Sequence, residues 1–186
     1  MKLSTITALV IAFTSIALCS SFFWDKLFEP DYEQIADTIT AKTAKKIKAE
    51  KNLIPIGTGG GMLGDIYMMA ISFDYYQEVD FNTARQLLVY CVEEYLSAIN
   101  SDEKVRPYLH NFPFTAKNIE IRIFFSTPDN DDVPLGSICV AASIKGRVDY
   151  DIKAPINLKL ETIREETYEE ALKIVSDKNE KEKGRK

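Results

Sequence analysis

The segment Asp80–Asn100 constrains the fold most strongly, because its apolar residues recur at the three- and four-residue spacing of an α-helix. Together they form one broad apolar arc: Ala84, Leu87, Leu88, Cys91, Val92, Tyr95, Ala98 and Ile99. A single helix cannot bury so wide an arc alone, and segments with strand character flank it in the sequence. We therefore expect this helix, capped by Asp80 or Asn82, to lie across a sheet and to organise a core.

Alternating apolar and polar residues predict the strands of that sheet. The strands are expected at 66–76, 117–125 and 137–153, with an edge strand at 156–161 after Pro155. A first helix is predicted to run to about Lys51 from a capping box formed by Asp31 and Gln34, and a last helix to begin at the capping box of Thr167 and Glu170. The predicted class is α+β: a mainly antiparallel sheet of about four strands with the central helix on one face, in the order α-β-α-β-β-β-α.

The N-terminus has the pattern of an export signal, an apolar run at 3–17 preceded by one basic residue, Lys2. Three outcomes stay open: cleavage after Cys19 or Ser21, lipidation of Cys19 at a sequence similar to a lipobox, or retention as a membrane span. Leu18, however, stands where a lipobox has a small residue. The expected organisation is a signal peptide or anchor at 1–24, one α+β domain at 25–176 and a disordered charged tail at 177–186. The protein would be periplasmic, membrane-anchored or secreted.

Charge and residue inventory argue against several classes of function. With 23 basic and 28 acidic residues, the net charge is -5, and no basic stripe with interleaved aromatics indicates nucleic acid as a partner. One histidine and no closely spaced cysteines do not build a zinc site, so neither a metal nor a cofactor is expected. Cys91 and Cys139 either form a disulfide or remain two separate thiols, and the apolar position of Cys91 on its helix favours separate thiols.

Two segments superficially match ligand-binding loops. The glycine-rich segment 57–64 lacks the Lys and Ser or Thr that follow the last glycine of a phosphate loop, so we interpret it as a turn or bulge feeding a strand. The acidic segment 127–134 lacks the glycine and the final carboxylate of an EF-hand, because position twelve is Val140. Turn formation explains its composition better.

The proline-stiffened segment 106–114 is the stretch that packing explains least well. Alternate residues of an extended chain share one side, which would bring its rings together. We predict a binding surface made by Arg106, Tyr108, His110, Phe112 and Phe114, with Gly59, Gly60 and Gly61 beside it. The alternative is that these aromatics only cover one end of the core.

Four runs in the chain, GTGGGMLGDIYMM, TARQLLVYCVEEYLSAIN, RPYLHNFPFTAKNIEIRI and ETYEEAL, resemble a group of uncharacterised exported proteins of intracellular bacteria, of chlamydia-related and Legionella type. The resemblance covers residues from about 57 to 172. It implies an exported bacterial protein and carries over no functional residues, because no activity is known for the group.

These observations favour binding over catalysis. The expected function is that of an exported, membrane-tethered or periplasmic interaction protein with a protein partner in the envelope or the host, touching the membrane through its N-terminal segment. Two alternatives stay open: a small enzyme that uses His110, the single histidine, as its acid-base group, or a structural envelope lipoprotein.

Overall fold

Residues 32–156 and 158–184 are described by the computed structural model. The chain divides into two units, Met1–Gln34 and Ile35–Lys186, and the second contains the sheet. The predicted export segment, the cap at Asp31 and the lipidation site Cys19 lie outside the described residues. Among the described helices, none is long and apolar enough to cross a membrane.

The fold is α+β, but the predicted number and order of its strands are wrong. The sheet has six strands in the spatial order β1-β2-β3-β4-β5-β6. All neighbouring pairs are antiparallel except β2 and β3, which run parallel because α3 crosses between them. In chain order the elements are α2 (Tyr32–Lys51), β1 (Ile54–Met62), β2 (Ile66–Tyr75), α3 (Phe81–Ser101), β3 (Ile119–Phe125), β4 (Ile138–Ile144), β5 (Arg147–Lys153), β6 (Leu160–Thr167) and α4 (Tyr168–Lys183).

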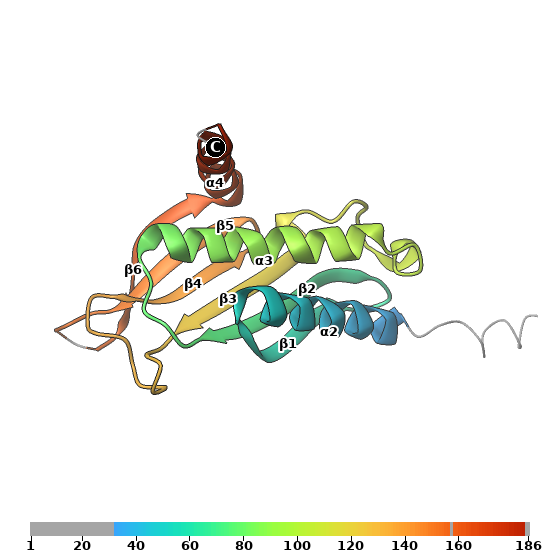
Figure 1. Cartoon of the computed structure of the whole chain (residues 1–186). Helices are drawn as coiled ribbons and strands as arrows, with labels where there is room; N and C mark the ends of the chain where they lie inside the picture. Colours follow the sequence, from blue (N-terminus) through green and yellow to red (C-terminus); the bar gives the residue numbers. More distant parts are fainter. Residues whose placement is uncertain (1–31, 157, 185–186) are drawn as a thin grey trace, which may run out of the picture. The chain divides into compact units, whose positions relative to one another are not determined.

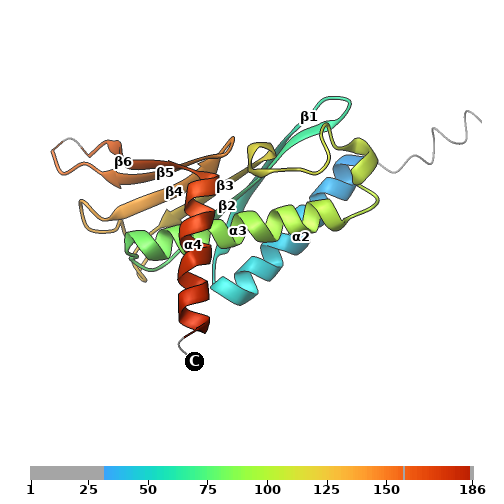
Figure 2. The ribbon, with the colours of Figure 1, turned by 90° about the horizontal axis from the view of Figure 1, so that it is seen from above.

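The central helix α3 is confirmed, together with its cap. The Asp80 carboxylate accepts a hydrogen bond from the Thr83 amide at 2.7 Å, and almost all of the predicted apolar arc is buried. Figures 1 and 2 show α2 and α3 on the same face of the sheet, and α3 packs on β3 and β4. Between the two helices, the fully buried Tyr95 hydroxyl lies 2.7 Å from Thr40 Oγ1. The core therefore lies between this helical layer and the sheet.

One edge strand was missed in the sequence and the other was placed too early, for the same physical reason. The glycine-rich segment is not a turn or bulge that leads into a strand but most of the edge strand β1, with Gly59, Gly60 and Gly61 paired to Ala70, Met69 and Met68. The other edge strand, β6, begins at Leu160, later than the predicted strand 156–161. Both strands are largely exposed, so neither carries the apolar alternation of a half-buried strand.

The predicted long strand 137–153 is two strands joined by a tight turn. Lys145 and Gly146 both have positive φ, 52° and 79°, as the two central residues of a type I′ hairpin turn require. The adjoining residues of β4 and β5, Ile144 and Arg147, face each other across the pair.

The capping box of Thr167 and Glu170 is confirmed at the start of α4, which continues to Lys183, into the segment expected to be a disordered tail. Cys91 is buried and Cys139 half-buried, and both are free thiols, so the predicted alternative of two separate thiols holds.

Candidate functional site

The segment 106–114 and the β1–β2 hairpin meet at one end of the sheet. Leu109 forms a parallel bridge with Ile66, and the His110 amide donates a hydrogen bond to the Ile66 carbonyl at 2.8 Å. Next to that bridge, His110 Nδ1 lies 2.6 Å from the Asp65 carboxylate. The aromatic segment and the glycine-rich strand, predicted to lie beside each other, are thus joined through the hairpin turn.

The segment is not extended, so its rings do not share one side. Arg106 and Tyr108 belong to a short 3-10 turn, which breaks the two-residue alternation expected from the sequence. Phe112 is 51% exposed, and the Arg106 guanidinium lies over its ring, 4.7 Å from the ring centre. Phe114, by contrast, is only 2% exposed and belongs to the core. Of the predicted residues, Arg106, His110 and Phe112 are accessible, Tyr108 is half-buried and Phe114 is not available to a partner.

Asn100, at the end of α3, holds the segment in this path. Its side-chain amide donates to the Phe114 carbonyl at 2.9 Å, and its side-chain oxygen accepts from the Phe114 amide at 2.7 Å. Val105 and Leu109 are buried beneath the segment. The exposed ring of Phe112 is therefore presented by a backbone that is anchored on both sides.

The hairpin contributes two exposed side chains that were missed in the sequence. Leu63, in the turn, is 88% exposed, and Tyr67, at the start of β2, is 49% exposed. The sequence did carry one signal for Leu63. A large aliphatic residue in a glycine-rich turn is unusual, because turns favour small polar residues, and it indicates an exposed apolar side chain. We use the name aromatic end for the set Leu63, Asp65, Tyr67, Arg106, His110 and Phe112.

Within β1, the three predicted glycines have different local requirements. A Cβ on Gly61 would lie 2.2 Å from Cε2 of Tyr67, so the Tyr67 ring covers this glycine. At Gly57, by contrast, a Cβ would meet nothing within 4 Å. Gly61 therefore serves to seat the Tyr67 ring rather than to approach a phosphate.

Replacing Gly61 with alanine is expected to displace the Tyr67 ring and to lower the free energy of unfolding by about 1 kcal/mol, since the ring is half-exposed and can swing away. Denaturant unfolding measures the loss. The Gly57→Ala control should be neutral or stabilising by up to about 1 kcal/mol, because a strand glycine is itself unfavourable. Equal effects at the two positions would contradict the role assigned to Gly61.

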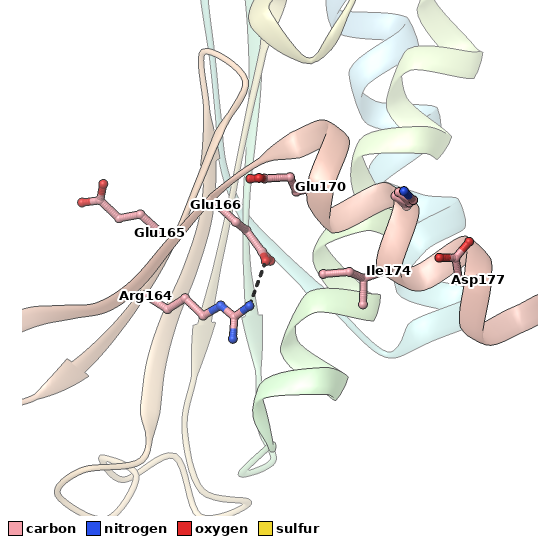
Figure 3. Close-up of a pocket in the computed structure, with 7 residues that line it drawn as sticks. Arg164, Glu165, Glu166, Glu170, Ile174 and Asp177 are labelled. Atoms are coloured by element: carbon pink, nitrogen blue, oxygen red, sulfur yellow. Dashed lines mark ion pairs between the residues drawn. The ribbon is translucent and has the colours of Figure 1, made fainter.

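Away from the aromatic end, a groove of about 430 Å³ lies between β6 and α4 and is shown in Figure 3. It is lined by Arg164, Glu165, Glu166, Glu170, Lys173, Ile174 and Asp177. In Figure 3, Arg164 and Glu166 point toward each other and Ile174 extends from α4 toward them, while Glu165 points away. Six of its seven lining residues carry charges of both signs and only Ile174 is apolar, whereas small-molecule sites are lined mostly by apolar side chains.

The buried carboxylate of that groove is already fully engaged. Arg85 donates from Nε and Nη2 to the two oxygens of Glu166, at 2.7 and 2.9 Å, and the Tyr150 hydroxyl donates to Oε1 at 2.7 Å. Burial raises the pKa of Tyr150, so this hydroxyl stays protonated as a donor. Glu166 therefore ties α3 to the sheet and is not free to act as a general base.

Nucleophilic and metal chemistry find no support in the part of the chain that the structure describes. Burial strongly raises the pKa of the Cys91 thiol, which removes its nucleophilic thiolate form. Among the described residues, no group of three or more His, Cys, Asp or Glu side chains could hold a metal ion. The aromatic end is thus the best candidate for a functional surface.

Comparison of the chain with protein-family models, curated proteins and solved structures found no match.

Proposed function

We propose that this protein is an exported, membrane-tethered binding protein and that the aromatic end is its binding surface. The observation that carries the proposal is the exposure of Leu63, Tyr67 and Phe112, three large side chains from two segments held together by the Ile66–Leu109 bridge. Exposed aromatic and aliphatic residues on an anchored backbone are typical of binding surfaces, because little conformational entropy is lost when they are covered. The apolar N-terminal run supports export and tethering.

Arg106 adds the polar component that such a surface needs. Its guanidinium is held over the Phe112 ring at 4.7 Å, which orients the charge while leaving the side chain exposed. Arginine and aromatic side chains are the residue types that dominate binding energy at interfaces.

The proposal is tested by placing a photoreactive p-benzoylphenylalanine at Phe112 in the cells that produce the protein. After irradiation, the protein purified from its own membranes should carry an adduct, detected by intact mass, because the benzophenone lies within reach of whatever covers the surface. The same substitution at Ser176, an exposed position on α4, is the matched control. A protein without adduct at Phe112, or with equal adducts at both positions, would rule out the aromatic end as the binding surface.

The same mass reports the state of the N-terminus. A mass that begins at Cys19 with added acyl chains, or one that corresponds to the full-length chain, agrees with tethering. A mass that begins near Ser20 or Phe22 without lipid would show a cleaved, secreted protein and contradict the tethered form of the proposal.

A second candidate is an enzyme that uses His110, because the 2.6 Å contact with Asp65 is the carboxylate–imidazole pair of many acid-base sites. His110 and Asp65 side chains are 57% and 41% exposed, however, which leaves the pair in water. The binding function has the stronger support.

A further inference from the structure

From the arrangement of α2 and the β1–β2 hairpin, we infer that the aromatic end docks on the lipid surface of the membrane to which the chain is tethered. The inference rests on the proposed function, because it names the partner of the same surface. It is carried by the place where the second unit begins, by the chemistry of the aromatic end, and by the contrast between the aromatic end and a second exposed apolar cluster.

The second unit begins, at Ile35, on the side of the aromatic end. The part of α2 in this unit, residues 35–51, is about 26 Å long and the nine residues of β1 span about 30 Å, and a two-residue connection joins them. The strand therefore runs back along the helix, and the β1–β2 turn returns to about the level of Ile35. Figures 1 and 2 agree, since in both views β1 runs back along α2 and the hairpin turn lies at the same end of the sheet as the segment after α3.

The tether expected from the sequence is short. Only residues 25–34 separate the uncharged run 3–24 from Ile35, the first residue of the second unit. Ten residues span at most about 36 Å when fully extended. A lipidated or membrane-spanning N-terminus would therefore keep this unit within a short distance of the bilayer, on the side of Ile35.

The aromatic end has the composition of an interfacial membrane surface. Leu63 projects from a turn with 88% of its surface exposed, and Tyr67 and Phe112 are about half exposed, so these side chains can enter the headgroup region without rearrangement of the fold. Arg106 is exposed on the segment 106–114 and can place its charge at the phosphate level.

Acidic groups at this end are partly engaged with neighbouring residues. The Asp65 carboxylate is paired with His110 at 2.6 Å, and Asp102 is engaged as the C-cap of α3, where it accepts hydrogen bonds from the amides of Lys104 and Val105. Asp37 on α2 and Glu103 are exposed, and so is Lys104. Insertion of the exposed apolar side chains, rather than attraction between charges, therefore carries the membrane contact.

A second exposed apolar cluster lies at the opposite end of the sheet. We call it the apolar tip; it consists of Leu135, Ile156, Leu158 and Leu160, exposed by 51%, 98%, 64% and 61%. Its neighbouring charges are mixed, because the exposed Lys159 stands between Leu158 and Leu160 and Lys153 is paired with the exposed Asp132. Its distance from Ile35, rather than its charge, sets it apart from the aromatic end, because the short tether joins the second unit at Ile35.

Membrane docking needs only modest intrinsic affinity because the chain is already tethered. A short linker converts the contact into an intramolecular event with a high effective concentration. A tethered protein therefore needs a smaller inserted surface than an untethered one.

The experiment measures quenching of a single tryptophan by brominated lipids. Full-length Leu63→Trp and Phe112→Trp variants, each with Trp24→Phe to remove the native tryptophan, are reconstituted in vesicles of phosphatidylethanolamine and phosphatidylglycerol with brominated acyl chains. An Ile156→Trp variant in the same background reports on the apolar tip. We expect quenching and a blue-shifted emission for the first two variants and neither change for the third.

Absence of quenching in both the Leu63→Trp and Phe112→Trp variants would overturn the inference, and so would equal quenching in all three. If quenching is absent but the photoreactive Phe112 variant gives an adduct with a protein, the aromatic end binds a protein and only the lipid assignment fails. If neither is seen, the proposed function fails as well.

Discussion

Replacing Glu166 with alanine should lower the free energy of unfolding by about 3 to 5 kcal/mol, the loss expected when one partner of a buried ion pair is removed. The side chains of Arg85 and Glu166 are only 4% and 5% exposed, and they share two hydrogen bonds. Without the carboxylate, the Arg85 charge would remain buried and the Tyr150 hydroxyl would lose its acceptor. Urea unfolding of the full-length protein measures the effect.

The Glu165→Ala variant is the matched control. Glu165 is adjacent and exposed, so its replacement should change stability by no more than about 0.5 kcal/mol. A similar loss for both variants would show that the buried pair has no special role.

The contribution of this pair should also depend on pH. Burial raises the pKa of Glu166, but hydrogen bonds from Arg85 and Tyr150 and the charges of Arg85 and Arg164 outweigh burial and leave the pKa below its ordinary value. The stabilisation is therefore fully present above the carboxyl pKa of the unfolded chain and is lost as the pH falls through the lowered pKa. The stability difference between wild type and Glu166→Ala should narrow in that acidic window.

Replacing Tyr95 with alanine should cost about 3 to 5 kcal/mol, the range for removal of a large buried aromatic side chain. Tyr95 is fully buried on α3, and its hydroxyl lies 2.7 Å from Thr40 Oγ1 of α2. The change would leave a cavity between the two helices and remove the link that positions α2. Thermal and urea unfolding measure the loss.

The Tyr95→Phe variant separates the ring from the hydroxyl. It retains the packing and removes one hydrogen bond, so a loss of about 1 kcal/mol is expected. Thr40 keeps a partner in this variant, because its hydroxyl donates to the Ala36 carbonyl at 2.8 Å. If Tyr95→Phe were as destabilising as Tyr95→Ala, the hydroxyl rather than the packing would dominate at this site.

The central helix could be predicted from the sequence because burial on one side imposes a periodic pattern. The predicted arc of α3 is buried except for the half-buried Ala98, and the cap at Asp80 is present. Arg85 was missed, because its burial depends on Glu166, which lies 81 residues further along the chain. Periodicity reports which side of an element is covered, whereas pairing between distant polar residues leaves no local pattern.

One edge strand was missed and the other was misplaced for a related reason. In β1 the glycines have no side chains to alternate, and in β6 only Glu166 is buried. These two segments are strands because they pair with β2 and β5 in hairpins. Such pairing is not visible in the pattern of either segment alone. The aromatic end was predicted in part. Arg106, His110 and Phe112 were predicted for a binding surface and are exposed at this end. Leu63 and Tyr67 were not, because Leu63 lies in the segment interpreted as a turn or bulge and Tyr67 in a predicted strand.

The two outer strands of the sheet also affect how copies of the chain meet. The register between β1 and β2 shifts on both sides of the β1 glycines. The register between β5 and β6 shifts between Tyr150 and Asp151. The rim of β6 carries Glu161, Arg164 and Glu165, all exposed. Bulges and charges at a rim prevent a neighbouring strand from continuing the ladder. Molecules at high concentration could thus lie side by side without their sheets merging into an aggregate.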